Sequence, residues 1–217
     1  MKEYKLLALP QLVLIDCDGV LYDPAELDIN AMCYAFNDVC DDFGLQDEKF
    51  TNMEDCTYDK PVKGFCKYIE FVAQKLGIDT EDFIRKMVDH VDYSHLSLDE
   101  SGILQKLTEL SHKYKLCICS NNHKFHLNKV LKMRLGVEAA QLPIEVFDIM
   151  YAKQNGEFYT KESATFVAKL AKHYNIKADD FLWIDDNPKI LEKVQSYGSR
   201  AVLITKQKLL IDVLQEL

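Results

Sequence analysis

Five short apolar runs alternate with longer amphipathic stretches along this chain, and this alternation limits the possible folds more than any other feature. The runs have the length and β-branched content of strands buried on both faces, and they lie at 12–16, 115–120, 145–150, 181–185 and 201–205. Apolar residues at helical spacing predict helices at about 99–114, 160–174 and 188–197. Since strands that alternate with helices form right-handed βαβ units, we predict an α/β fold around a mainly parallel sheet.

The long segment between the first two strands differs from the rest of the chain. Residues 23–98 contain no predicted strand, and their patterns indicate helices at about 26–43, 61–76 and 80–91. We therefore expect a core domain formed by residues 1–22 and 99–217, with residues 23–98 inserted as a helical domain. This insert carries 7 Lys and Arg against 17 Asp and Glu, which is typical of a solvated helical face and would also repel polyanionic substrates at low salt.

Composition and charge disfavour several classes of protein. Hydrophobic residues make up 48% of the 217 residues, so the chain can bury a sizeable core. Its net charge of −9 disfavours a protein that binds nucleic acid polymers through their phosphates. The longest apolar run, residues 6–15, is too short for a membrane-spanning helix and is interrupted by Pro10. Seven cysteines without a CxxC pair favour reduced thiols and a cytoplasmic location.

Two acidic residues follow the first predicted strand. Asp16 and Asp18 are two positions apart, so on a strand their carboxylates would share one face, and Gly19 permits a sharp exit of the backbone. Two ionised carboxylates at short distance repel each other unless a cation binds them or one of them is protonated. Taken alone, the pair is equally compatible with a helix cap followed by a turn residue.

A second acidic pair ends the fourth predicted strand. Asp185 and Asp186 precede Asn187 and Pro188, a sequence that also suits the cap of the following helix. Polar groups at the carboxyl ends of parallel strands gather at one edge of the sheet, so both acidic pairs are expected to lie close together. Carboxylates in this number suit Mg²⁺, which binds one or two of them together with waters or phosphate oxygens. We therefore predict a magnesium site.

The remaining polar candidates follow the second and third predicted strands. Ser120 ends the second strand and is followed by Asn121, where a hydroxyl and the first N–H groups of a helix suit a phosphate oxygen. Lys161 stands at the start of the predicted helix 160–174, where a cation opposes the helix dipole unless an anion lies nearby. Lys153 is a second candidate, and simple surface exposure is the ordinary explanation for either lysine.

The order of these residues along the chain resembles that of the haloacid dehalogenase-like hydrolase superfamily. The similar segments are DCDGVLY at 16–22, CSNN at 119–122, TKESATF at 160–166 and WIDDNP at 183–188. They are more similar to the phosphatases and pyrimidine nucleotidase-like members of the superfamily than to its dehalogenases, which lack the second aspartate. The resemblance implies a Rossmann-like, three-layer α/β core and identifies the helical insert as a cap domain of the first type.

The resemblance also implies a chemistry for the acidic residues. Asp16 would attack the phosphorus of a small phosphomonoester and form an aspartyl-phosphate, and Asp18 would act first as an acid and then as a base. Mg²⁺ would be held by Asp16, the backbone carbonyl of Asp18 and Asp186. Asp185 would mainly orient these groups. The implied activity is that of a Mg²⁺-dependent phosphatase.

The implied phosphate site consists of Ser120, Asn121 and Lys161, which would bind oxygens of the transferring phosphoryl group. The substrate would be a small phosphorylated metabolite, such as a nucleotide or a sugar phosphate. Two alternatives remain open, namely a phosphomutase of the same superfamily and a catalytically silent interaction module. The sequence leaves the oligomeric state open.

Other side chains have less specific interpretations. Core packing is the ordinary expectation for the aromatic residues in and next to the insert, and substrate stacking is the alternative for Tyr22, Tyr34, Phe36, Tyr58, Phe65 and Tyr68. His123 and His126 follow the serine motif and could touch the substrate, but two histidines three residues apart are more often ordinary helix residues. Trp183 lies inside an apolar run and is expected in the core.

Overall fold

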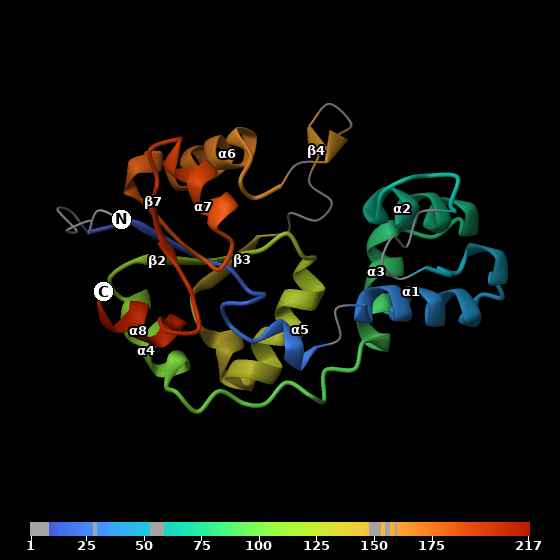
Figure 1. The fold of residues 1–217 in the computed structure, drawn as a ribbon, viewed down its shortest axis with the longest axis horizontal. Coiled ribbons are helices and arrows are strands. Elements are labelled where there is room, and N and C mark those ends of the chain that lie inside the picture. The colour runs from blue at the N-terminus through green and yellow to red at the C-terminus, as the bar shows by residue number, and fades with distance from the viewer. Residues whose placement is uncertain (1–8, 28–29, 53–58, 148–152, 155–156, 159) are drawn as a thin grey trace. The chain divides into compact units, whose positions relative to one another are not determined.

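The apolar runs pair into one parallel sheet in this computed structural model, which describes residues 9–27, 30–52, 59–147, 153–154, 157–158 and 160–217. The strand order is β3-β2-β1-β6-β7 (Figure 1), with β1 at Leu12–Ile15, β2 at Lys115–Cys119, β3 at Ile144–Phe147, β6 at Phe181–Asp185 and β7 at Arg200–Leu203. β1 is the central strand and pairs in parallel with both β2 and β6. The predicted α/β fold is thereby confirmed.

Helices cover both faces of this sheet, so the core has the three-layer, Rossmann-like arrangement expected from the sequence (Figure 1). One face carries α6 (Ala164–Tyr174) and α7 (Pro188–Gln195), and the other carries α4 (Ile103–Ser111), α5 (Lys124–Leu135) and α8 (Leu210–Gln215). The strands contribute a row of buried side chains to the cluster that includes α6 and α7: Leu12, Leu14, Cys117, Cys119, Phe181 and Trp183. The edge strands β3 and β7 are only half-buried, so the prediction of burial on both faces is wrong for these two.

The start of α6 differs from the sequence prediction. The helix begins at Ala164 rather than at residue 160, because Ser163 Oγ accepts a hydrogen bond from the N–H of Phe166 at 3.2 Å and caps the helix. Lys161 therefore lies in the turn before α6 and not in its first helical turn. Its position is set by the contacts of that turn rather than by the helix.

Other predicted elements differ from the structure mainly at their ends. α4 begins after Gly102, which adopts a left-handed conformation with φ of 89°. The predicted strand 145–150 corresponds to β3, and its last three residues lie outside the described part of the chain. The sequence did not predict α8, nor the two-stranded antiparallel sheet of β4 (Lys153–Gln154) and β5 (Glu157–Phe158).

The chain divides into two compact units, one comprising residues 1–23 and 97–217 and the other residues 24–96. The second unit contains α1 (Ala31–Asp42), α2 (Phe65–Leu76) and α3 (Thr80–His90), of which the first two begin later than the predicted helices. It has a core of its own, in which the ring of Phe36 stacks on that of Phe50 with centroids 4.3 Å apart. Phe36 and Tyr68 are fully buried in it, whereas Tyr34 is exposed and Tyr58 lies outside the described residues.

The remaining helical segments are short. Helices of the 3₁₀ type lie at Pro24–Glu26, Gln46–Glu48, Val137–Gln141 and Ala178–Asp180. Within the described ranges, no helix of either unit has the length and apolar content that are needed to cross a membrane.

A buried carboxylate stabilises the helical unit. Glu48 accepts hydrogen bonds from the Tyr68 hydroxyl and the Lys75 ammonium. Burial alone would raise the pKa of Glu48, but these hydrogen bonds outweigh it and lower that pKa below its ordinary value. The ionised carboxylate therefore stabilises the fold above the unfolded-state pKa of about 4.3, and this contribution is lost as the pH falls through the lower folded-state pKa.

We expect Glu48→Gln to lower the free energy of unfolding by about 1–2 kcal/mol at pH 7, because the amide loses the charge-assisted hydrogen bond from Lys75. The difference from the wild type is expected to shrink as the pH falls below about 4. Thermal unfolding followed by circular dichroism measures both effects. Glu100→Gln, at an exposed position of the other unit, is the control, and equal losses in the two variants would contradict the interpretation.

Candidate active site

Polar residues gather at the carboxyl ends of the three central strands. Asp16 directly follows β1, Ser120 directly follows β2, and Asp185 is the last residue of β6. The pairing of β1 with β6 continues for one residue beyond β1, since the N–H of Asp16 donates to the carbonyl of Ile184 at 2.9 Å. Parallel pairing therefore brings side chains from distant parts of the chain to one edge of the sheet.

The Lys161 ammonium lies between two of these carboxylates. Its Nζ is 2.7 Å from Asp16 Oδ1 and 2.7 Å from Asp185 Oδ2, and all three side chains are buried. Burial alone would lower the pKa of Lys161, but the two carboxylates outweigh it and raise that pKa. Lys153, the alternative lysine, lies in β4, outside the five-stranded sheet.

An asparagine after β2 holds the turn that carries Lys161. Asn121 Oδ1 accepts a hydrogen bond from the backbone N–H of Lys161 at 2.8 Å, across 40 positions of the chain. The sequence predicts Asn121 as a phosphate ligand. In the structure its side-chain oxygen ties the turn before α6 to the end of β2 and so helps to position the lysine, and the role of Asn121 as a phosphate ligand stays a prediction.

Asp16, Asp185 and Asp186 form an acidic cluster. Each offers a carboxylate oxygen, and these oxygens all lie within 4.8 Å of one another. Asp16 and Asp185 are buried, whereas Asp186 is exposed to solvent. Burial raises the pKa of Asp16 to about 7, with Lys161 opposing the shift and Asp185 adding to it. A divalent cation fits this set of hard oxygen donors, because its charge would favour their ionised forms.

Gly19 allows Asp186 to take its place in the cluster. The φ angle of Gly19 is +75°, a left-handed conformation that residues with a side chain rarely adopt. A Cβ atom on residue 19 would overlap the carboxylate of Asp186. The approach of Asp186 to the backbone after β1 therefore requires glycine at position 19.

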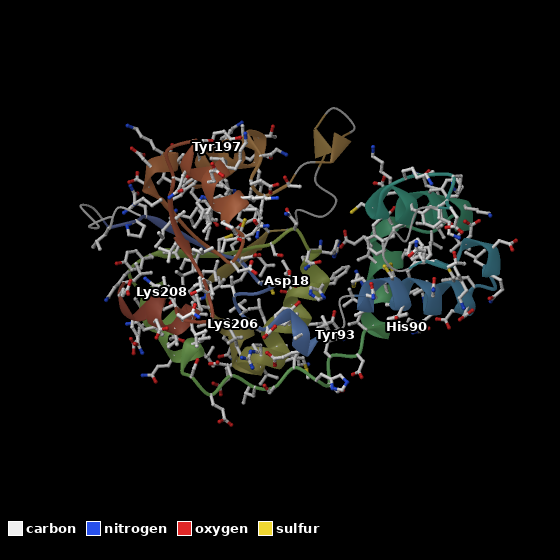
Figure 2. The ribbon with its side chains drawn as sticks, viewed as in Figure 1. Asp18, His90, Tyr93, Tyr197, Lys206 and Lys208 are labelled. Carbon is white, nitrogen blue, oxygen red and sulfur yellow. The ribbon has the colours of Figure 1, made fainter. Side chains whose placement is uncertain are left out.

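Asp18 lies in the turn after β1 and is labelled in Figure 2. Its Oδ2 accepts hydrogen bonds from Ser120 Oγ at 3.1 Å and from Asn122 Nδ2 at 2.6 Å. Its Oδ1 accepts one from the Tyr22 hydroxyl and lies 3.9 Å from His126 Nε2. Burial alone would raise the pKa of Asp18, but the contacts with His126 and Tyr22 outweigh it and lower that pKa to about 2.

Two side chains around Asp18 have roles that the sequence did not indicate. The sequence leaves core packing and substrate stacking open for Tyr22, and an ordinary helix position and a substrate contact open for His126. In the structure both side chains are buried and lie against Asp18. His123, by contrast, caps α5, because its Nδ1 accepts a hydrogen bond from the N–H of Phe125 at 3.3 Å. Tyr22 follows Asp18 by four residues in a turn, and this spacing is the one sequence feature that could have indicated a contact between the two side chains.

Solved structures share this fold at low sequence identity. A HAD family enzyme from Bacteroides thetaiotaomicron, in complex with magnesium and inorganic phosphate, is 14% identical with a TM-score of 0.51, and the match covers 90% of this chain and 94% of that chain. A predicted HAD-like family hydrolase from Porphyromonas gingivalis is 12% identical with a TM-score of 0.55, covering 96% of this chain and 98% of that chain.

A third structure extends the comparison. A HAD-superfamily hydrolase of subfamily IA, variant 1, from Geobacter sulfurreducens is 18% identical with a TM-score of 0.51, and the match covers 90% of this chain and 89% of that chain. Identities this low show a common fold only. No curated protein matches this chain.

The match to a protein family covers most of the chain. The model of the haloacid dehalogenase-like hydrolase family matches residues 10–192, a span that runs from just before β1 into α7. It includes the acidic cluster, Lys161 and the residues around Asp18. With more than half of its length matched, this chain is an enzyme that belongs to the haloacid dehalogenase-like hydrolase family.

Proposed function

We propose that this protein is a Mg²⁺-dependent phosphohydrolase that cleaves a small phosphomonoester through an aspartyl-phosphate on Asp16. The position of the Asp16 carboxylate carries this proposal, because it contacts the Lys161 ammonium and belongs to the acidic cluster. A carboxylate can attack an anionic phosphate only where positive charge offsets the repulsion between the two anions. The magnesium and phosphate in the Bacteroides structure support the assignment.

The acidic cluster would hold the magnesium ion. Asp16, Asp186 and the backbone carbonyl of Asp18 would bind it directly. Asp185 would mainly orient the groups around the ion, since its carboxylate contacts the Lys161 ammonium. When bound, the ion supplies positive charge to the phosphate oxygens and reduces the repulsion among the carboxylates.

In the first step, an oxygen of Asp16 attacks phosphorus, and the bond between phosphorus and the ester oxygen breaks. Ser120 and Lys161 bind the oxygens of the transferring phosphoryl group. Asp18 gives a proton to the departing oxygen, so the alcohol leaves in its neutral form. Although Asp18 has a low pKa in the structure, an anionic phosphoryl group beside it would favour its protonated form.

In the second step, a water molecule attacks the phosphorus of the aspartyl-phosphate. Asp18 takes a proton from this water, the bond between phosphorus and the Asp16 oxygen breaks, and inorganic phosphate leaves. The carboxylate of Asp16 and the proton on Asp18 are thereby restored. A phosphomutase would differ only here, because a sugar hydroxyl would replace water as the acceptor.

Residues 23–98 are proposed to act as a cap that reads the part of the substrate beyond the phosphate. This proposal is supported by the family resemblance and by the helical unit at residues 24–96. The acidic excess of the insert favours a small metabolite over a nucleic acid polymer, and a nucleotide or sugar phosphate fits this class. A cytoplasmic location is part of the proposal, because seven cysteines without a CxxC pair favour reduced thiols.

A panel of phosphorylated metabolites tests the proposed activity. We expect the protein to release inorganic phosphate from at least one monoester in the presence of Mg²⁺, to lose this activity with EDTA and to regain it when Mg²⁺ is added in excess. Conversion of a sugar phosphate without phosphate release would instead indicate a phosphomutase. Neither phosphate release nor conversion on the whole panel would indicate a catalytically silent module.

Asp16→Asn is expected to reduce Mg²⁺-dependent kcat by at least about a thousandfold, because an amide cannot form the aspartyl-phosphate. The circular dichroism spectrum is expected to stay unchanged. Asp179→Asn, at an exposed position before the start of β6 and so at the other end of that strand from Asp185, is the matched control and should keep full activity. A folded Asp16→Asn protein with near-normal turnover would refute the nucleophile assignment.

Lys161→Met is expected to abolish turnover and to lower the free energy of unfolding by about 3–5 kcal/mol without Mg²⁺, because two buried carboxylates lose the cation between them. Mg²⁺ should raise the melting temperature of this variant more than that of the wild type, because it would be the remaining cation in the cluster. Differential scanning calorimetry with and without Mg²⁺ measures this. Lys172→Met, which changes an exposed lysine, is the control. If Mg²⁺ raised the melting temperature of Lys161→Met no more than that of the wild type, the result would count against the metal site.

Gly19→Ala is expected to weaken Mg²⁺ binding by about tenfold or more, because the added methyl group displaces the Asp186 carboxylate. Isothermal titration with Mg²⁺ measures the change in affinity. Gly198→Ala is a matched control, since Gly198 also has a positive φ of 94° but a Cβ there would meet nothing within 4 Å. Equal Mg²⁺ affinities in the two variants would contradict the role of Gly19.

A further inference from the structure

The Asp18 carboxylate is held at both of its oxygens. Ser120 and Asn122, which follow β2, donate hydrogen bonds to Oδ2, and Tyr22 donates one to Oδ1. A carboxylate that is bonded at one oxygen can still rotate, because its terminal torsion has a broad energy minimum. Hydrogen bonds at both oxygens fix the plane of the Asp18 carboxylate, and Oδ2 is therefore the oxygen that faces Ser120.

The backbone after β1 places Tyr22 in contact with Asp18. The N–H of Leu21 donates to the Cys17 carbonyl at 2.8 Å, and the N–H of Gly19 donates to the Tyr22 carbonyl at 3.0 Å, so the chain folds back on itself. The Tyr22 side chain is only 5% exposed. A phenylalanine ring would fill the same space, so the hydroxyl contributes its hydrogen bond rather than packing volume.

The Tyr22 hydrogen bond gains importance when phosphate is bound. A serine hydroxyl has a single proton, so Ser120 cannot donate to Asp18 and to a phosphoryl oxygen at the same time. Under the proposed function, Ser120 turns to the phosphoryl group and leaves Oδ2. Tyr22 at Oδ1 and Asn122 at Oδ2 still hold the carboxylate at that moment, so its plane stays fixed and Oδ2 stays on the side where Ser120 binds phosphate.

We infer that Tyr22 is a positioning residue for Asp18, whose Oδ2 its hydroxyl keeps aimed at the leaving group of the phosphomonoester. The inference rests on the proposed function, in which Asp18 is the acid and base. Tyr22 acts through Asp18 and has no contact with the phosphate in this scheme. Its loss should therefore impair proton transfer to the leaving group more than substrate binding.

A comparison of two leaving groups tests this inference. The p-nitrophenolate ion is a weak base and departs without a proton, whereas an alkoxide must be protonated as it leaves. For Tyr22→Phe we expect kcat/KM for an alkyl phosphate, chosen from the substrates of the wild type, to fall about tenfold or more relative to kcat/KM for p-nitrophenyl phosphate. KM and the Mg²⁺ affinity should change little.

Tyr114→Phe is the matched control, because Tyr114 is a buried tyrosine of the same unit whose hydroxyl donates to the carbonyl of Leu217 at 3.1 Å. It should lower kcat/KM for both substrates equally or not at all. The same result for Tyr22→Phe would overturn the inference and leave Tyr22 with a structural role. If Tyr22→Phe does not fold, as judged by circular dichroism, the comparison is made with Tyr22→Met, which also lacks the hydroxyl.

Failure of the proposed function has a different signature. A wild-type protein that releases no phosphate from any monoester with Mg²⁺ would refute the proposed function itself. If the wild type is active and Asp18→Asn loses the alkyl phosphate selectively while Tyr22→Phe does not, Asp18 remains the acid and Tyr22 is not its positioning residue. Selective loss in both variants supports the two assignments together.

Discussion

The ion pairs of Lys161 are the interaction on which the rest of the site depends. A buried ammonium is stable only where anions offset the loss of its hydration, and Asp16 and Asp185 do so from two neighbouring strands. The same ammonium lets two carboxylates stay close together inside the protein. The lysine therefore assembles the site before any substrate arrives, and in the proposed reaction its charge also offsets the repulsion between Asp16 and an incoming phosphate.

The turn after β1 separates the two chemical environments of the site. Gly19 adopts a left-handed backbone conformation and has no side chain, and both properties allow the Asp186 carboxylate to join the acidic cluster. In the same turn, the carboxylate of Asp18 is surrounded by hydrogen-bond donors, and Tyr22 folds back against it. Burial, with a further contribution from Asp185, raises the pKa of Asp16, whereas the contacts with His126 and Tyr22 lower the pKa of Asp18. Ligands would shift both values, because a bound cation would favour the ionised form of Asp16 and an anionic phosphoryl group beside Asp18 would favour its protonated form.

The pattern of the sequence predicted the layout of the fold better than the ends of its elements. Apolar runs that alternate with helical stretches have few alternatives to a covered parallel sheet, so the sheet followed from the pattern of these runs. Helix ends depend on single capping contacts, which is why α6 begins at Ala164, after Ser163, rather than at 160. The edge strands β3 and β7 are half-buried because strand order, which apolar content does not reveal, leaves them with one neighbour each.

Residue order already specifies which chemical groups follow which strands. Carboxylates, a hydroxyl and a lysine follow successive strands, and parallel pairing brings them to one edge of the sheet. The hydrogen-bond and ion-pair partners of these groups, by contrast, become visible only in the folded chain. Asn121 holds the Lys161 turn from 40 positions away, and Tyr22 and His126 meet Asp18. The physical reason is that a hydrogen bond depends on positions within a few tenths of an ångström, whereas residue order specifies only which strand end a side chain follows.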